Sequence, residues 1–568
     1  MNEEEIQTTD LWDLYEKSVT FMSLRNIYSD TDRNYRMYNG NQWEGLKVEG
    51  IEKIQYNFIK PIIKHKVTTV TSNLFAVNYS PENIEQPEFM ELAQKACDLL
   101  NKKASKVWDK DFMDKKVKKW TRQAAINDEA VCYVTYDKDQ DLPINEIINK
   151  NDIMYGNENE DEIQLQPYIL IRQRMPISEL RRMAAVEGLS KEKIDQIVSD
   201  NDTSTIAGDD GKQELEDKCW VVTKLFKDKG KIYFSKATKY VTIKENKDTG
   251  LTKYPVAHFN WEDNEGNARG IGEVRQLIPN QLETNKTAMR RAISTKMLAY
   301  PQRVVNINSI VNKSAINKIG STIEFKDMGN TKASDVFMVT SPAAMSPDSE
   351  KLQNELISYS RELNNASDIT TGSINPEQAS GKAILAVQNA QNQPLNDQLT
   401  DLKTFIEDIA RIWFEMWKTY ASDGLKVMIE DIDPVTGQKK EESVYIPSYI
   451  LDVLETSVKV DITPKGSYDR YAQELSLENL LKQGLITFDE YVDSLDSDSV
   501  MPKAKLQEII KRRKAAQEEI QNIQTQAETM KQQAIQRNQN AADIQNIANS
   551  GGKMIEQYMS NQGNEATE

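Results

Sequence analysis

The C-terminal region carries the strongest constraint on what this chain can form. From Ala516 to Ala548, small or apolar residues recur at alternating steps of four and three positions, and Arg537 is the charged interruption. This heptad spacing keeps a narrow seam along one side of a helix. Because the seam is rich in alanine, it favours close helix–helix packing in an oligomer. Its larger side chains are Ile520, Ile523, Met530 and Ile544.

Composition excludes several classes of protein. The 568 residues carry a formal net charge of −17, whereas proteins that grip nucleic acid over a whole surface are usually basic. A channel that DNA passes without being gripped remains possible. The three cysteines are scattered and form no CxxC, which predicts buried free thiols in a reducing compartment. No apolar run approaches 18 residues and the N-terminus lacks an apolar signal region, so neither a membrane span nor secretion is expected.

The first 260 residues are predicted to form one α+β unit. Apolar periodicity predicts a helix over residues 10–38 and a longer helical stretch over 88–130. A β-hairpin is predicted from Cys219–Phe226 and Ile232–Phe234, because a Lys-Asp-Lys-Gly turn separates them. Residues 199–213 have turn chemistry and almost no apolar content, which indicates a loop.

The middle of the chain has a different organisation. A helix is predicted from Gly270 to about Leu298, and Tyr300-Pro301 ends it. Residues 301–345 contain three short strand-like runs, and a second helix follows Pro347. Two helices therefore bracket a small β-containing module.

The remaining segments alternate between loop, helix and strand. We predict a loop over 367–380, a helix over 381–420 that Pro394 kinks or breaks, strands over 425–462 and short helices over 468–500. The end of the chain after Gly551-Gly552 is expected to be disordered because it is rich in Asn and Gln.

Motifs of enzyme chemistry fail when they are compared with their templates. Ser380-Gly381-Lys382-Ala383 lacks the upstream glycine and the final Ser or Thr of a Walker A loop. The run around Asp431, Asp433 and Glu442 places its glycine one position too late for an EF-hand. With only His65 and His258, His-rich metal sites are excluded. We therefore predict no catalytic site, no metal site and no cofactor.

Positive charge concentrates in the middle of this acidic chain. Residues 270–300 carry a net +3 and residues 301–345 a net +2. This can be a solvated helix face, or a basic surface that meets an acidic partner or passing DNA.

An ordered set of residues resembles the portal proteins of tailed bacteriophages. In the N-terminal part these are Tyr35, Tyr38, Gly40, Gln42, Trp43, Asn57–Pro61 and Asn78–Pro81; in the middle they are Ala268–Val274, Gln276, Leu277, Pro279, Gln281 and Asn285. The order of helix, small β module, helix, loop and long kinked helix is also similar over residues 10 to 500.

The resemblance implies an α+β portal-type subunit with named parts. These are a wing (1–265 and 381–467), a two-helix stem (266–300 and 346–366), a clip (301–345), a tunnel loop (367–380), a helical crown (468–501), a C-terminal helical barrel (502–550) and a disordered tail (551–568). Such subunits form a ring, typically of twelve, at one capsid vertex. The ring serves as the channel for packaging and ejection of double-stranded DNA.

The resemblance also implies roles for particular residues. The tunnel-loop candidates are Thr370, Thr371, Gly372, Ser373 and Asn375; Arg290, Arg291 and Lys296 on the stem would face DNA or neighbouring subunits; Lys313, Lys318, Lys326 and Lys332 on the clip would bind partners. The expected partners are the terminase large subunit, a head-completion or adaptor protein, and the major capsid and scaffold proteins. The protein would be made in the host cytoplasm and kept in the virion.

Two alternatives stay open at this point. One is another virion structural protein built on a coiled coil, which would keep the C-terminal oligomer without the central module. The other is a metal-dependent enzyme of nucleic-acid processing that uses Asp493, Asp496 and Asp498, or Asp431 and Asp433. The shortage of histidine and other conventional partners disfavours the enzyme.

Overall fold

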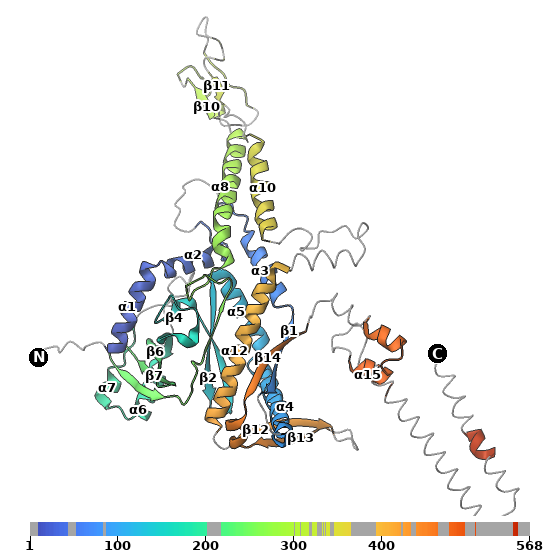
Figure 1. Cartoon of the computed structure of the whole chain (residues 1–568). Helices are drawn as coiled ribbons and strands as arrows, with labels where there is room; N and C mark the ends of the chain where they lie inside the picture. The colour runs from blue at the N-terminus through green and yellow to red at the C-terminus, as the bar shows by residue number, and fades with distance from the viewer. Residues whose placement is uncertain are drawn as a thin grey trace, which may run out of the picture. The chain divides into compact units, whose positions relative to one another are not determined.

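The computed structural model describes most of the chain before residue 500. The described residues are 9–43, 53–82, 87–200, 217–299, much of 302–340, 346–364, 393–463 with two short gaps, 476–494, 506, 510 and 549–554. They contain both helices and antiparallel sheets, which confirms the α+β class (Figure 1). The chain divides into two compact units, Met1–Thr463 and Pro464–Glu568, and each is considered by itself.

The N-terminal helical stretch is divided in two. Helices α1 (Asp10–Leu24) and α2 (Ile27–Asn39) replace the single helix predicted over residues 10–38. The break falls at Asn26, whose φ of 60° lies in the left-handed region that asparagine tolerates better than most residues. The predicted stretch over 88–130 likewise becomes α4 (Pro87–Lys110) and α5 (Met113–Asn127).

The largest sheet has five antiparallel strands in the order β4-β5-β6-β7-β8. They are Ile153–Tyr155, Tyr168–Pro176, Lys218–Asp228, Lys231–Ala237 and Thr242–Asp248. The predicted β-hairpin is confirmed, because β6 and β7 pair around a turn at Lys229-Gly230 where both residues have positive φ. Apolar side chains of α1 and α2 cover one face of the sheet, and α6 (Ile177–Val186) covers the other.

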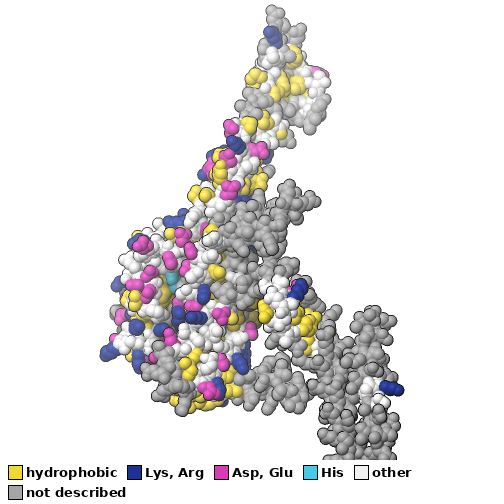
Figure 2. Space-filling model, turned by 45° about the vertical axis from the view of Figure 1, so that its right-hand side comes forward, with side chains coloured by type: hydrophobic (Ala, Val, Ile, Leu, Met, Phe, Trp, Pro, Cys, Tyr) yellow, Lys and Arg dark blue, Asp and Glu magenta, His cyan; other side chains and the backbone are white. Residues whose placement is uncertain are grey.

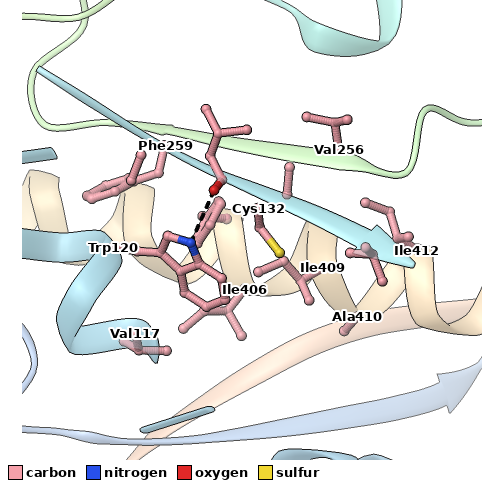
Figure 3. Close-up of a cluster of buried hydrophobic side chains, with 14 of the residues drawn as sticks. Val117, Trp120, Cys132, Val256, Phe259, Ile406, Ile409, Ala410 and Ile412 are labelled. Carbon is pink, nitrogen blue, oxygen red and sulfur yellow. Dashed lines mark hydrogen bonds between the residues drawn. The ribbon is translucent and has the colours of Figure 1, made fainter. Parts of the chain in front are cut away.

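The central core lies where α5, a three-stranded sheet and α12 (Asn396–Tyr420) meet (Figure 3). The sheet has the order β3-β2-β9, with strands Leu142–Ile148, Glu129–Asp137 and Val256–Asn260. Trp120 donates a hydrogen bond to the Val131 carbonyl at 3.2 Å and contacts the Phe405 ring edge-on, with centroids 5.4 Å apart. Helix α12, late in the sequence, is thus buried in a core that the first 260 residues build.

A second contact joins the same distant parts of the chain. Strand β1 (Leu74–Pro81) pairs antiparallel with β14 (Thr456–Thr463), and the Tyr79 hydroxyl donates to the Ala410 carbonyl of α12 at 2.7 Å. Strands β12 (Leu425–Ile432) and β13 (Lys439–Ile446) form a hairpin, so strands predicted over 425–462 are confirmed.

Helix α12 begins just after a 3-10 turn that contains Pro394. Proline lacks the N–H that a continuous helix needs at this point. The portion of the predicted 381–420 helix that precedes residue 393 lies outside the described residues.

A helical hairpin projects from this body in Figure 1. Helix α8 (Glu273–Ala299) runs outward and α10 (Asp348–Leu363) returns beside it, and both helices were predicted. Between them, β10 (Gln302–Val305) pairs with β11 (Phe337–Thr340). The third predicted strand is wrong: residues 321–325 form only an isolated bridge, between Phe325 and Ile310.

The second unit contains a small helical cluster in its described part. Helix α15 (Phe488–Asp493) buries Tyr491 and Val492 against Leu477 and Leu481, in agreement with the short helices predicted over 468–500. The heptad seam, with Ile520, Ile523, Met530 and Ile544, lies outside the described residues.

Candidate functional site: base and tip of the helical hairpin

Two of the three predicted basic residues of α8, Arg290 and Arg291, form ion pairs on the hairpin itself. Arg290 pairs with Glu283 of the same helix at 2.9 Å. Arg291 crosses to α10, where it donates to Gln353 at 3.0 Å and pairs with Glu350 at 3.1 Å. Lys296 lies in the last turn of α8. Arg291 therefore has a structural contact within the subunit that the sequence did not predict.

The far end of the hairpin, which we call the tip, consists of the described residues from 302 to 340. Lys313, Lys318, Lys326 and Lys332 are all exposed there. Apolar side chains are exposed beside them, and Figure 2 shows hydrophobic groups gathered on this end of the molecule. These exposed apolar residues are Val304, Val311, Phe325, Met338 and Val339. Exposed apolar groups that cluster are typical of a surface that contacts another molecule.

Most of the other predicted site residues lie outside the described residues. Thr370, Thr371, Gly372, Ser373 and Asn375 lie outside the described residues. Of the carboxylates considered for a metal, Asp431 lies in β12 and Asp493 ends α15, while Asp433, Asp496 and Asp498 are also outside. Within the described part of the chain, no three His, Cys, Asp or Glu residues lie close enough together to hold a metal ion.

The near end of the hairpin, which we call the base, comprises residues 269–285 and the side chains that contact them. Here Gln281 and Asn285 of α8 are fully buried. Gln281 accepts a hydrogen bond from the Phe58 backbone N–H at 3.0 Å and donates to the Tyr56 carbonyl at 2.7 Å. Asn285 accepts from the Tyr56 N–H at 3.1 Å and donates to Gln42. The base therefore unites two groups of residues that the sequence analysis selected separately.

The first residue of α8 ties both helices of the hairpin to α3 (Ile59–Val70). Glu273 forms an ion pair with Lys66 of α3 and accepts a hydrogen bond from the Trp261 indole at 3.1 Å. Lys66 also donates to Asn364, directly after α10, at 3.3 Å. One buried ammonium group thus holds the start of α8 and the end of α10.

Just before α8, Arg269 is the centre of a buried ion network. Its guanidinium pairs with Glu129, which is fully buried, and with Glu158 at 2.9 Å, and it lies over the Tyr155 ring at 4.9 Å. His258 contacts the other oxygen of Glu129 at 3.1 Å. Burial alone would raise the pKa of Glu129, but Arg269 and His258 outweigh it and hold that pKa at about 2.

The glycines between Arg269 and α8 are required by close packing. A Cβ on Gly270 would lie 2.6 Å from the Glu262 carbonyl oxygen, and one on Gly272 would lie 2.9 Å from the Asp128 backbone nitrogen. Asp128 accepts a hydrogen bond from the Gly272 N–H at 2.7 Å and so places a carboxylate at the N-terminus of α8. Both glycines therefore allow the segment that leads into α8 to pack closely against the body.

Sequence reasoning missed the partners of Arg269. Glu129 and Glu158 lie more than 100 residues before it, and they are spaced by no recognisable motif. The resemblance did select the segment that contains Arg269, but only the fold shows which side chains it contacts.

Comparison with known protein families identifies the chain. The model of the phage P22-like portal protein family matches residues 24–558, which include both the base and the tip. No curated protein sequence matches significantly. The chain therefore belongs to the P22-like portal protein family. Membership implies a bacteriophage protein that assembles as a capsid-associated ring and has a structural role. No helix in the described ranges is long and apolar enough to cross a lipid bilayer.

Proposed function

We propose that the chain forms a ring, typically of twelve subunits, at one capsid vertex. The ring is the channel through which double-stranded DNA is packaged and ejected. In this proposal the helical hairpin is the stem, the tip is the clip, and the body with α12 is the wing. The unplaced segment 367–380, with Thr370 and Gly372, is the tunnel loop.

One observation carries the proposal: a rigidly anchored helical hairpin presents a small exposed β module far from the body. The base is fixed by buried hydrogen bonds from Gln281 and Asn285 and by the ion pair of Glu273 with Lys66. The tip exposes apolar and lysine side chains. This arrangement suits a platform on which the terminase large subunit docks during packaging and a head-completion protein docks afterwards.

The charge distribution favours a channel that DNA passes through and disfavours a surface that binds DNA tightly. The chain has a net charge of −17, so phosphates are repelled at long range. Arg290 and Arg291 are each paired with a glutamate, which reduces the positive charge they present to DNA. A packaged genome could then slide with little affinity for the wall.

The tip can be tested through a cross-strand pair. Val304 and Met338 lie directly opposite each other on β10 and β11 and are 57% and 53% exposed. We expect the V304D/M338D variant to assemble normally and to lose most of its binding to the terminase large subunit of the same phage. The control is V186D/V198D, at two exposed apolar positions on the body. Equal docking by both variants would refute the clip assignment.

A further inference from the structure

A cleft of about 730 Å³ lies beside the base and is unrelated to the tip. One wall is α1, and the opposite side is formed by residues around Tyr155–Asn159 and by the segment that leads into α8. The cleft is open to solvent, and its lining includes Ile271 and Arg275 of the base.

The charges that line this cleft are unequally paired. Each of its carboxylates has a cation: Asp30 pairs with Arg33 at 3.0 Å, Asp128 with Lys150, and Glu158 with Arg269. Three exposed cations of the lining have no carboxylate partner in the part of the chain that the structure describes. They are Lys17, Arg25 and Arg275. In an acidic protein, this leaves a local site for negative charge.

The cleft also offers apolar contacts. Leu14, Met22, Tyr168 and Ile271 line it together with Phe21, which is 38% exposed. A free phosphate ion would leave these side chains in water. The combination of three cations with apolar walls fits a short acidic peptide that carries an apolar side chain.

Such a peptide precedes α1 in this chain. Residues 1–8 contain Glu3, Glu4 and Glu5 followed by Ile6, so three carboxylates match the three cations that have no carboxylate partner among the described residues. The described chain begins at Thr9, which donates through its backbone N–H to Lys239 in the β7–β8 turn at 3.1 Å. This contact fixes the point at which the acidic segment joins α1.

The length of the segment shows which of these cations it can contact. Arg25 lies about 24 Å from Thr9 along α1, at 1.5 Å per helical residue. The Cα atoms of the three glutamates reach about 14 to 20 Å back from Thr9 when the chain is fully extended. Because the long glutamate and arginine side chains bridge the remaining distance, the segment can contact both Lys17 and Arg25 of its own subunit, where its effective concentration is high.

We propose that the acidic segment 1–8 docks in the α1 cleft of its own subunit, held by Lys17, Arg25 and Arg275. Its carboxylates replace water around the three cations, and its apolar side chain contacts the apolar wall.

The recognition is tested with a labelled peptide of residues 1–8 and the full-length E3Q/E4Q/E5Q chain, in which the cleft is open. Binding is expected to saturate, to weaken with added salt, and to fall about 30-fold in the K17E/R25E/R275E background. The matched control K102E/K118E/K119E makes the same charge change at exposed lysines outside the cleft and should alter affinity less than about threefold. Equal losses in both variants, or no saturable binding, would overturn the proposal.

A peptide with lysine at positions 3–5 provides the complementary measurement. It should bind the K17E/R25E/R275E cleft and not the original one. Failure of this charge swap, in a variant that still folds by circular dichroism, would also overturn the proposal.

Disulfide trapping identifies the subunit whose N-terminal segment occupies the cleft. The three native cysteines are buried, so Glu4→Cys and Ser18→Cys introduce the accessible thiols. The double variant should form the crosslink within one chain on oxidation. Covalent dimers from mixed single variants, with no crosslink inside the double variant, would refute the assignment to the same subunit. The native mass is measured on the same samples, so a ring without crosslinks contradicts this inference alone, and a chain that never assembles contradicts the ring.

Discussion

The base and the tip of the helical hairpin are built on opposite principles. At the base, Gln281, Asn285 and Arg269 are buried, and each is hydrogen-bonded to a segment distant in sequence. At the tip, Val304 and Met338 are exposed and the two short strands pair mainly with each other. Buried polar contacts stabilise a joint that must keep its geometry, whereas a docking surface leaves apolar groups exposed for a partner.

Arg269→Leu is expected to have the largest effect on stability. It leaves Glu129 and Glu158 without their cation, and removing one partner of a buried ion pair costs about 3 to 5 kcal/mol. Urea unfolding measures the loss. Arg290→Leu, which breaks an exposed pair on the same hairpin, should cost less than about 1 kcal/mol. Similar losses for the two variants would contradict the distinction between the buried base and the exposed surface of the hairpin.

The acid sensitivity of the base follows from the same network. The pKa of Glu129 is about 2 in the folded protein, below its ordinary value of 4.5. The stability contributed by the ionised carboxylate is therefore complete above about pH 4.5 and is lost as the pH falls toward 2, by about 3 kcal/mol in total.

Unfolding free energies of Glu129→Gln measured from pH 7 to pH 3 should therefore fall less steeply below pH 4.5 than those of the original protein. Glu91→Gln, at an exposed ion pair with Lys95, is the control and should leave the slope nearly unchanged. An unchanged slope in Glu129→Gln would show that this carboxylate does not carry the acid response.

Gly272→Ala sharpens the comparison through packing alone. The added methyl group would meet the Asp128 backbone nitrogen at 2.9 Å and the Ala124 carbonyl at 3.2 Å, so we expect a loss of about 1 to 3 kcal/mol. Gly552→Ala, where no more distant atom of the described residues lies within 4 Å of the new methyl group, should be neutral or stabilising. Differential scanning calorimetry of both variants checks the sign.

Asn285→Ala tests the contact between α8 and residues 42–58. It removes the hydrogen-bond partner of the Tyr56 N–H and of the Gln42 side-chain oxygen, which costs about 1 to 2 kcal/mol. Hydrogen exchange at Tyr56 should accelerate in the variant. Gln276→Ala, at an exposed position of α8 about two and a half turns earlier, should change neither quantity. An equal effect would mean that the side-chain amide of Asn285 is dispensable.

The smallest stability effect belongs to the tip. V304D/M338D should change the unfolding free energy by less than about 0.5 kcal/mol, because both side chains are already exposed. Its docking defect should nevertheless be large. A strongly destabilised variant would mean that this pair is part of a core and not of a free surface.

Local patterns in the sequence predicted local structure well. The turn that contains Lys229 and Gly230 predicted the β6–β7 hairpin, and Tyr300-Pro301 predicted the end of α8. The boundary at Asn26 was missed because apolar periodicity continues across it. The partners of Arg269 and Asn285 could not be predicted, because each lies more than 100 residues away and pairs through the fold alone. The resemblance to portal proteins, now confirmed, pointed to the right segments without naming these contacts.

The central claim is that this chain closes into a ring, and the native mass of the purified protein tests it most directly. Twelve subunits of 64.9 kDa predict a homogeneous particle of about 780 kDa, and electron-microscopic class averages should show an axial hole. A stable dimer or trimer without a hole, under conditions in which the chain is folded and capsid scaffold is present, would contradict the account.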